Sequence, residues 1–305
     1  MSVEKESVRG SAEMIASMVI AGTVGWFVVM ADQAPQVVVF WRCVFGALTM
    51  LMICFARRLF KTLTLDKGVL LFLLIGGVAL ALNWVFLFKA YTLSSIAIAT
   101  ITYHTEPFIL VAFGVFLFKE KINLDKILWL ICAFVGTVLI IAGKQGGAAS
   151  QGDTYIWGVL YAILAAFFYA CAAIITKKLK HIPPHIIVVF QLFVGALVLL
   201  PMTSLEEVAN ISMASWSYLA IIGVVHTGLM CLLLYSAIQK ISTTLVGALS
   251  FIYPVVSVLV DWLAFGNTLS VTQMGGSVAI LVAAAGVNLG WKLTRKPALE
   301  QQAVD

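Results

Sequence analysis

The strongest constraint on this chain is a series of ten long apolar segments separated by short polar joints. A helix needs about 20 mostly apolar residues to cross a bilayer, and the continuous runs lack the two-residue alternation of a membrane β-barrel. Only 11% of the 305 residues are charged and 62% are apolar, whereas about a quarter of a soluble domain is charged. We therefore predict an all-α polytopic membrane protein. Its ten predicted spans are 11–31, 35–56, 68–88, 95–118, 124–143, 155–176, 184–203, 216–238, 243–263 and 270–291.

The positions of the Lys and Arg residues predict the orientation of these spans. With ten spans both termini lie on one side, and that side holds 16 of the 19 Lys and Arg residues. Lys89 and Lys144 fall on the other side, and Arg42 lies within a span. Because Lys and Arg gather in cytoplasmic loops, both termini are expected in the cytoplasm. The net charge of +5 is scattered over loops, which disfavours a nucleic-acid partner.

The chain also repeats itself. A shift of 147 positions places Gly76 on Gly223 and Pro107 on Pro254. Each repeat holds five spans, an odd number, so the second copy enters the membrane inverted. Inverted repeats are typical of secondary transporters, although a duplicated scaffold without transport would have the same symmetry. The predicted domains are a first five-helix repeat at 10–143, a linker at 144–154, a second repeat at 155–291 and a cytoplasmic tail at 292–305.

Five motifs carry a family resemblance along residues 10–291. They are FWR at 40–42, LFKAYTLSSIAIATITYHTEPF at 87–108, FLFKEKIN at 116–123, WGVLYAILAAFFYA at 157–170 and YSAIQKISTTLVGALSFIYP at 235–254. In their order and spacing the chain resembles the drug/metabolite transporter superfamily, specifically its EamA-type ten-helix exporters. In the second repeat Asn267 takes the place of Glu120, a departure near a helix end that concerns structure more than substrate.

The resemblance implies two inverted five-helix repeats around a central cavity, lined mainly by the first, third, fourth, sixth, eighth and ninth spans. It implies export of amino acids or related small metabolites across the bacterial inner (cytoplasmic) membrane by alternating access, with or without proton coupling. We expect no cofactor, and a monomer or weak homodimer. Import of a cationic or quaternary-amine nutrient and lipid flipping are the alternatives. The chain has no GxxxxGK[ST], HExxH or GxSxG motif, which argues against an ATP-driven pump or an intramembrane hydrolase.

The most polar segment within a predicted span is YHTEP at 103–107. An ionisable side chain at membrane depth costs at least ~2.5 kcal/mol on insertion scales. Glu106 is therefore predicted to bind a substrate ammonium or to carry a proton, and His104 is a second candidate proton carrier. A fixed ion pair between helices is the structural alternative. Pro107 removes a backbone donor and its ring opposes the carbonyl four residues earlier, so a kink is expected there and at Pro254.

Other polar and aromatic residues within the spans complete the predicted site. Arg42 has the fork geometry that binds a carboxylate. The family resemblance implies that it lies in a helix peripheral to the cavity, which favours a structural role with Glu106 or helix-end carbonyls as partners. The remaining candidates for substrate binding are Trp26, Asn83, Trp84, Tyr103, Tyr169, His226 and Tyr253. Ordinary helix packing is the alternative for each of them. The five cysteines lie within predicted spans without metal-ligand spacing, so neither a metal site nor a disulfide framework is predicted.

Overall fold

The computed structural model describes residues 3–62, 66–94, 96–143, 154–203, 211–266 and 269–293. Ten helices in this part of the chain are long and apolar enough to cross a membrane, which confirms the predicted ten-helix fold. No strand occurs among the described residues. The expected linker residues 144–153, Asn267 and the tail from residue 294 lie outside them.

Seven of the spans are single α-helices. They are α1 (Val3–Ala31), α2 (Pro35–Ala56), α3 (Lys67–Leu93), α6 (Leu124–Ala142), α7 (Thr154–Lys178), α8 (Pro184–Leu199) and α14 (Val271–Leu289). Short 3-10 turns follow two of them, η1 (Leu59–Thr62) after α2 and η2 (Leu200–Met202) after α8.

Three spans are interrupted near their middle. The fourth is α4 (Ile96–Tyr103) followed by α5 (Glu106–Phe118), and the ninth is α12 (Thr243–Ser250) followed by α13 (Ile252–Phe265). The eighth is α10 (Met213–Gly223), the π-helical segment η3 (Val224–Leu229) and α11 (Met230–Lys240). Interrupted helices expose backbone groups, which are tolerated at membrane depth only where protein or water covers them.

Short polar side chains begin five of the helices that start at the membrane surface. Each accepts a hydrogen bond from the backbone N–H three residues further on, which satisfies one of the free donors of a first helical turn. These N-caps are Asp66, Asn123, Ser212, Ser242 and Ser270, and the last forms a capping box with Gln273.

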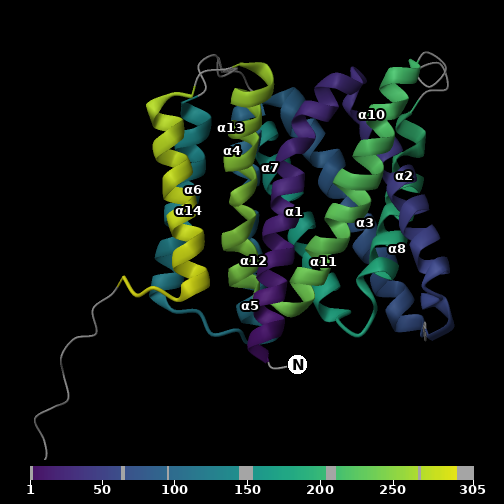
Figure 1. Ribbon diagram of the computed structural model, residues 1–305, viewed down its shortest axis with the longest axis horizontal. Helices are drawn as coiled ribbons and strands as arrows, with labels where there is room; N and C mark the ends of the chain where they lie inside the picture. The colour runs from purple at the N-terminus through teal and green to yellow at the C-terminus, as the bar shows by residue number, and fades with distance from the viewer. Residues whose placement is uncertain are drawn as a thin grey trace, which may run out of the picture.

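The two halves run through the bundle in opposite directions. Both ends of the described chain lie at the lower edge of the bundle in Figure 1, and we call this side the terminal face. The first helix, α1, begins at this face, where Gly10 packs against Ile241. The helix of the sixth span, α7, ends at the same face, as shown by the bond from Lys177 Nζ to Ile241 O at 2.6 Å. The second half is therefore inverted with respect to the first.

Packing between the halves is reciprocal. The first helix of each half lies between the third and fourth spans of the other: α1 packs against α11 and α13, and α7 packs against α3 and α5. The pair α6–α14 forms one edge of the bundle, and α2, α8 and α10 lie at the other (Figure 1).

Glycines permit the closest approach between α6 and α14. Gly136 and Gly276 face each other's carbonyl oxygens, and Gly286 faces the Trp129 ring. Small residues at such crossings allow helices to approach closely in a membrane.

The outer surface of the bundle is apolar. Large side chains such as Phe116, Leu71 and Ile75 are exposed by 80%, 56% and 46%. A water-soluble monomer rarely exposes so much contiguous apolar surface, whereas a membrane protein presents it to lipid. The polar side chains buried within the bundle are consequently the ones that need a partner or a function.

Candidate functional site

The fourth and ninth spans are each interrupted about one helical turn before a proline. The α4 helix ends at Tyr103, four residues before Pro107, and α12 ends at Ser250, four residues before Pro254. A proline ring opposes the carbonyl at that spacing. His104 Nδ1 lies 2.8 Å from Thr100 O, and a carbonyl can only accept, so Nδ1 carries the proton. The His104 ring is thus tied to its own helix.

Glu106 is the first residue of α5 and its side chain is only 7% exposed. Its Oε2 atom has no hydrogen-bond partner among the described residues. Ser250 lies within hydrogen-bonding range of the carboxylate, but its hydroxyl donates to Gly247 O at 2.8 Å. A hydroxyl has a single proton, so Ser250 cannot serve both acceptors at once. Glu106 is therefore a buried carboxylate whose hydrogen-bonding capacity is left open.

The two interrupted spans meet at this point. Gly247 of α12 packs against Pro107 of α5, close enough that a side chain at position 247 would displace the proline. The repeat relation aligns Glu106 with Tyr253 and His104 with Phe251. The His104 ring lies 6.2 Å from the rings of both Phe251 and Tyr253.

Several predicted residues gather around Glu106. The Tyr103 and Tyr169 rings lie edge to face at 6.3 Å, and both hydroxyl groups lie within electrostatic range of the Glu106 carboxylate. Asn83 Nδ2 donates to Tyr103 Oη at 3.1 Å and to Ala165 O at 2.9 Å, which holds the tyrosine in place. We call the set Asn83, Tyr103, His104, Glu106, Tyr169 and Tyr253 the break cluster.

A second cluster surrounds Arg42. Its Nε donates to Thr227 Oγ1 at 2.9 Å and its Nη2 to His226 O at 3.3 Å. The guanidinium carbon lies 5.4 Å from the centre of the Trp84 ring, within the range of a cation–π contact. We call Arg42, Trp84, His226 and Thr227 the arginine cluster.

Arg42 is not the partner of Glu106. Within the described ranges no carboxylate forms an ion pair with Arg42, and its acceptors are a hydroxyl and a carbonyl of the π-helical segment. Its structural contacts agree with the role favoured from sequence, while its positive charge is left without an anion. The guanidinium fork has five N–H donors, so donors remain for a carboxylate.

The π-helical segment displays His226 beside this charge. Thr227 Oγ1 donates to Ile222 O, five residues earlier, at 3.0 Å, and π-bulges occur frequently at functional sites. The His226 ring pairs with Thr23 Oγ1 at 2.9 Å through Nε2, while Nδ1 has no partner in the described part of the chain.

Trp26 borders the arginine cluster without belonging to it. Its ring packs against Phe27 at 4.8 Å and Tyr218 at 6.0 Å. Phe27 in turn lies 4.5 Å from the His226 ring. Trp26 thus reaches the cluster only through Phe27.

Cys231 of α11 interacts with residues of both the arginine cluster and the break cluster. It lies within electrostatic range of Arg42 on one side and of Tyr169 on the other. Cys231 therefore interacts with one member of each cluster.

Sequence reasoning missed a buried pair and two hydroxyls. Tyr235 donates to Gln191 Oε1 in a fully buried contact, and Gln191 Nε2 is left without a partner in the residues described. Gln191 is the repeat counterpart of Arg42, which is the signal that could have indicated it. Thr23 and Thr227 carried no such signal, because threonine is common in helices of this kind.

No group of three His, Cys, Asp or Glu side chains within metal-binding reach occurs in the described residues.

Comparison with known proteins identifies the family. The model of the EamA-like transporter family matches residues 9–142 and again residues 156–289. A solved crystal structure superimposes with a TM-score of 0.83 at 18% identity, covering 94% of this chain and 99% of that one. At this identity the superposition supports the fold alone.

Several relatives are named as transporters. The chain is 30% identical over 281 residues to the uncharacterized transporter YxxF of Bacillus subtilis, covering 92% of this chain and 90% of the relative. It is 29% identical to the pseudopaline exporter CntI of Pseudomonas aeruginosa, covering 81% and 83%. It is 23% identical to the aromatic amino acid exporter YddG of Ancylobacter novellus, covering 57% and 60%. Since both halves match the family model and the relatives are transporters rather than enzymes, this chain belongs to the EamA-like transporter family.

Proposed function

We propose that this protein exports amino acids or related small zwitterionic metabolites across the cytoplasmic membrane by alternating access. The observation that carries the proposal is a pair of unsatisfied charges within the bundle. Glu106 presents a carboxylate oxygen without a partner, and Arg42 has no carboxylate among the described residues. A ligand with an ammonium at one end and a carboxylate at the other supplies what each lacks.

The break cluster receives the cationic end of the substrate. Glu106 binds the ammonium through Oε2, and the faces of Tyr103 and Tyr169 add cation–π attraction. The arginine cluster receives the carboxylate through the free guanidinium donors of Arg42. Hydrogen bonds to charged groups contribute roughly 1.5–3 kcal/mol each, so a ligand that lacks either charge should bind about 10- to 150-fold more weakly.

Proton coupling follows from competition at Glu106. An unpaired buried carboxylate is costly at membrane depth, so after the substrate leaves, Glu106 takes a proton. Substrate ammonium and proton then exclude each other, which is the condition for antiport. His104 is the weaker candidate, because its Nδ1 proton is engaged with Thr100 O.

Alternating access uses the inverted halves. Each half supplies one interrupted span, α4–α5 or α12–α13, and their contact at Pro107 and Gly247 is the place where the halves shift against each other. Two inverted repeats packed reciprocally have two related arrangements, one open to each side. The central cavity predicted from the resemblance lies between them in this proposal.

The terminal face is the cytoplasmic side in this proposal, as the distribution of Lys and Arg predicts. A cysteine in place of Lys67 on the terminal face should resist a membrane-impermeant maleimide added to intact cells. A cysteine in place of Asp32, in the turn after α1 at the opposite face, should react. The reverse pattern would invert the assignment.

Counterflow in proteoliposomes tests the function. Labelled α-amino acids, ω-amino acids with a longer separation of charges, amines and quaternary amines are offered with and without a pH gradient. Saturable exchange of zwitterions alone supports the proposal, and stimulation of net flux by the gradient supports antiport. Exchange of amines or quaternary amines alone would favour the cationic nutrient, which Glu106 and its tyrosines could bind without Arg42.

A further inference from the structure

A recess lies at the terminal face, away from both clusters. It is a cavity of about 400 Å³ between the ends of α5, α7 and α11. Its wall includes Phe118, Gln239 and the four lysines Lys177, Lys178, Lys180 and Lys240. Pockets of roughly 300–1,000 Å³ are large enough for small ligands. We call it the lysine pocket.

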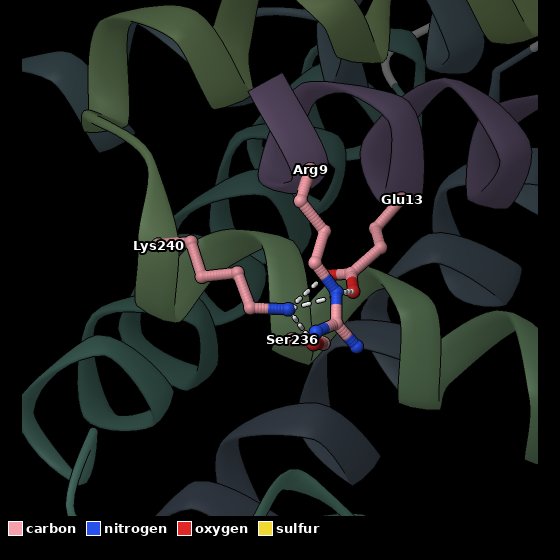
Figure 2. A network of polar contacts seen from close by, with 4 residues as sticks. All are labelled: Arg9, Glu13, Ser236 and Lys240. Atoms are coloured by element: carbon pink, nitrogen blue, oxygen red, sulfur yellow. Dashed lines mark hydrogen bonds and ion pairs between the residues drawn. The ribbon is translucent and has the colours of Figure 1, made fainter. Parts of the chain in front are cut away.

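Two of the four lysines, Lys177 and Lys240, are paired with carboxylates and form part of the pocket wall. Lys240 donates to the Glu13 carboxylate, with Nζ 2.6 Å from Oε1, and to Ser236 Oγ at 2.6 Å. Figure 2 shows this network, in which Arg9 Nε also donates to Glu13 Oε1, at 3.0 Å. The pairing ties α1 to the end of α11.

Lys177 is held in the same way from the other side of the pocket. Its Nζ lies 3.1 Å from Glu120 Oε1 and 2.6 Å from Ile241 O. Glu120 also accepts from the backbone N–H and the hydroxyl of Thr243, at 2.9 Å and 2.7 Å. Two of the four pocket lysines are thus paired with a carboxylate, Lys177 with Glu120 and Lys240 with Glu13, which Arg9 also contacts.

Lys178 and Lys180 supply the remaining charge. Lys178 Nζ lies 4.1 Å from the centre of the Phe72 ring, and no carboxylate in the described ranges pairs with either lysine. The turn that carries Lys180 is fixed by Gln239, whose Nε2 donates to Leu179 O at 3.2 Å and Ile182 O at 3.1 Å. The pocket therefore combines a rigid wall with two unneutralised ammonium groups.

The position of the pocket relative to the membrane indicates which anion it binds. Lys178 and Lys240 are the last residues of their membrane spans, so the pocket lies at the level of the lipid headgroups. Next to Phe72, the side chains of Leu71 and Ile75 face outward from α3. A phospholipid can place its phosphate in the pocket and its acyl chains along this apolar surface.

We propose that the lysine pocket binds the phosphate of an anionic phospholipid through Lys178 and Lys180. The chemistry is that of a phosphate monoanion or diester, which a soluble phosphate ester shares. The lipid is favoured because the pocket opens where the spans end and beside apolar surface. Each lysine near an anionic membrane surface contributes about five-fold to binding, so loss of both weakens it roughly 30-fold.

The test compares lipid binding of purified protein in phosphatidylcholine nanodiscs doped with phosphatidylglycerol or cardiolipin. Retained lipid is counted by native mass spectrometry, and the thermal midpoint is measured in the same discs. The pocket variant is Lys178→Gln with Lys180→Gln. The control is Lys67→Gln with Lys121→Gln, which removes the same charge from exposed sites on the same face. A third variant with arginine at both pocket positions should retain binding.

The proposal requires that anionic lipid is retained and stabilises the wild type, the control and the arginine variant, but not the pocket variant. An equal response of pocket variant and control would overturn it, since the effect would then be one of surface charge. Stabilisation by inorganic phosphate or glycerol 3-phosphate without lipid retention would assign the pocket to a soluble anion instead. Both outcomes are independent of the counterflow experiment, so failure of the amino-acid proposal would leave this inference standing.

Discussion

Replacement of Glu106 by glutamine separates a binding carboxylate from a structural one. The amide keeps the size of the side chain and removes its charge. Because Oε2 has no partner in the described residues, no bond at that atom is lost, and a neutral amide is less costly to bury than a carboxylate. The thermal midpoint should stay unchanged or rise slightly.

Substrate binding should respond very differently. A hydrogen bond between charged groups contributes roughly 1.5–3 kcal/mol, so the apparent affinity for an ammonium-bearing substrate should fall by about 10- to 150-fold. The assay is counterflow in proteoliposomes with the substrate that the panel identifies. Stimulation by a pH gradient should disappear as well, because the variant has no proton to exchange at this position.

Glu120→Gln is the matched control, two residues beyond the end of the same span. Glu120 accepts from Thr243 and Lys177, so its substitution should lower the free energy of unfolding by about 1–3 kcal/mol, with little change in substrate affinity once folded. If Glu106→Gln instead behaved like this control, the Glu106 carboxylate would be a structural partner. Unchanged affinity and unchanged pH response would also refute the role given to Glu106.

Three further substitutions follow from contacts in the structure. Arg42→Gln should raise the KM for zwitterions about 10- to 150-fold and leave the corresponding decarboxylated amines unaffected; equal losses for both would exclude carboxylate recognition. Gly136→Ala places a methyl group on the Gly276 carbonyl and should destabilise the protein by about 1–3 kcal/mol, whereas Gly275→Ala, which meets open space, should be neutral in the same thermal scan. Glu13→Gln should lower the thermal midpoint by leaving Lys240 without its anion; an unchanged midpoint would show that the Figure 2 network contributes nothing to the terminal face.

Much of the architecture follows from the pattern of apolar segments. The ten spans are present, because hydrocarbon admits a helix only where about 20 apolar residues follow one another. The interruptions at Tyr103 and Ser250 lie four residues before Pro107 and Pro254, where the local chemistry of proline acts. The repeat is equally readable, since duplicated prolines and glycines stay in register along the chain.

The candidate site could be predicted only in part from the sequence. Asn83, Tyr103, His104, Tyr169 and Tyr253 were all singled out from sequence, and in the structure they are linked by ring contacts and by the hydrogen bond from Asn83 to Tyr103. Tyr103 and Tyr169 also interact electrostatically with Glu106. Local sequence cannot reveal that Arg42 reaches the π-helical segment instead of Glu106, because the two groups lie on different helices. The π-helical segment contains no proline and no two adjacent glycines that would mark it in the sequence.

The sequence by itself determined that this chain spans a membrane ten times in two inverted halves, because hydrophobic length, proline position and charge placement act locally along the chain. Only the tertiary structure decided which charges are satisfied. Glu13 and Glu120 have lysine partners, whereas Glu106 and Arg42 lack a counterion within the described residues. That distinction depends on distances between helices far apart in sequence, and it separates the residues that hold the bundle together from those left free to bind a ligand.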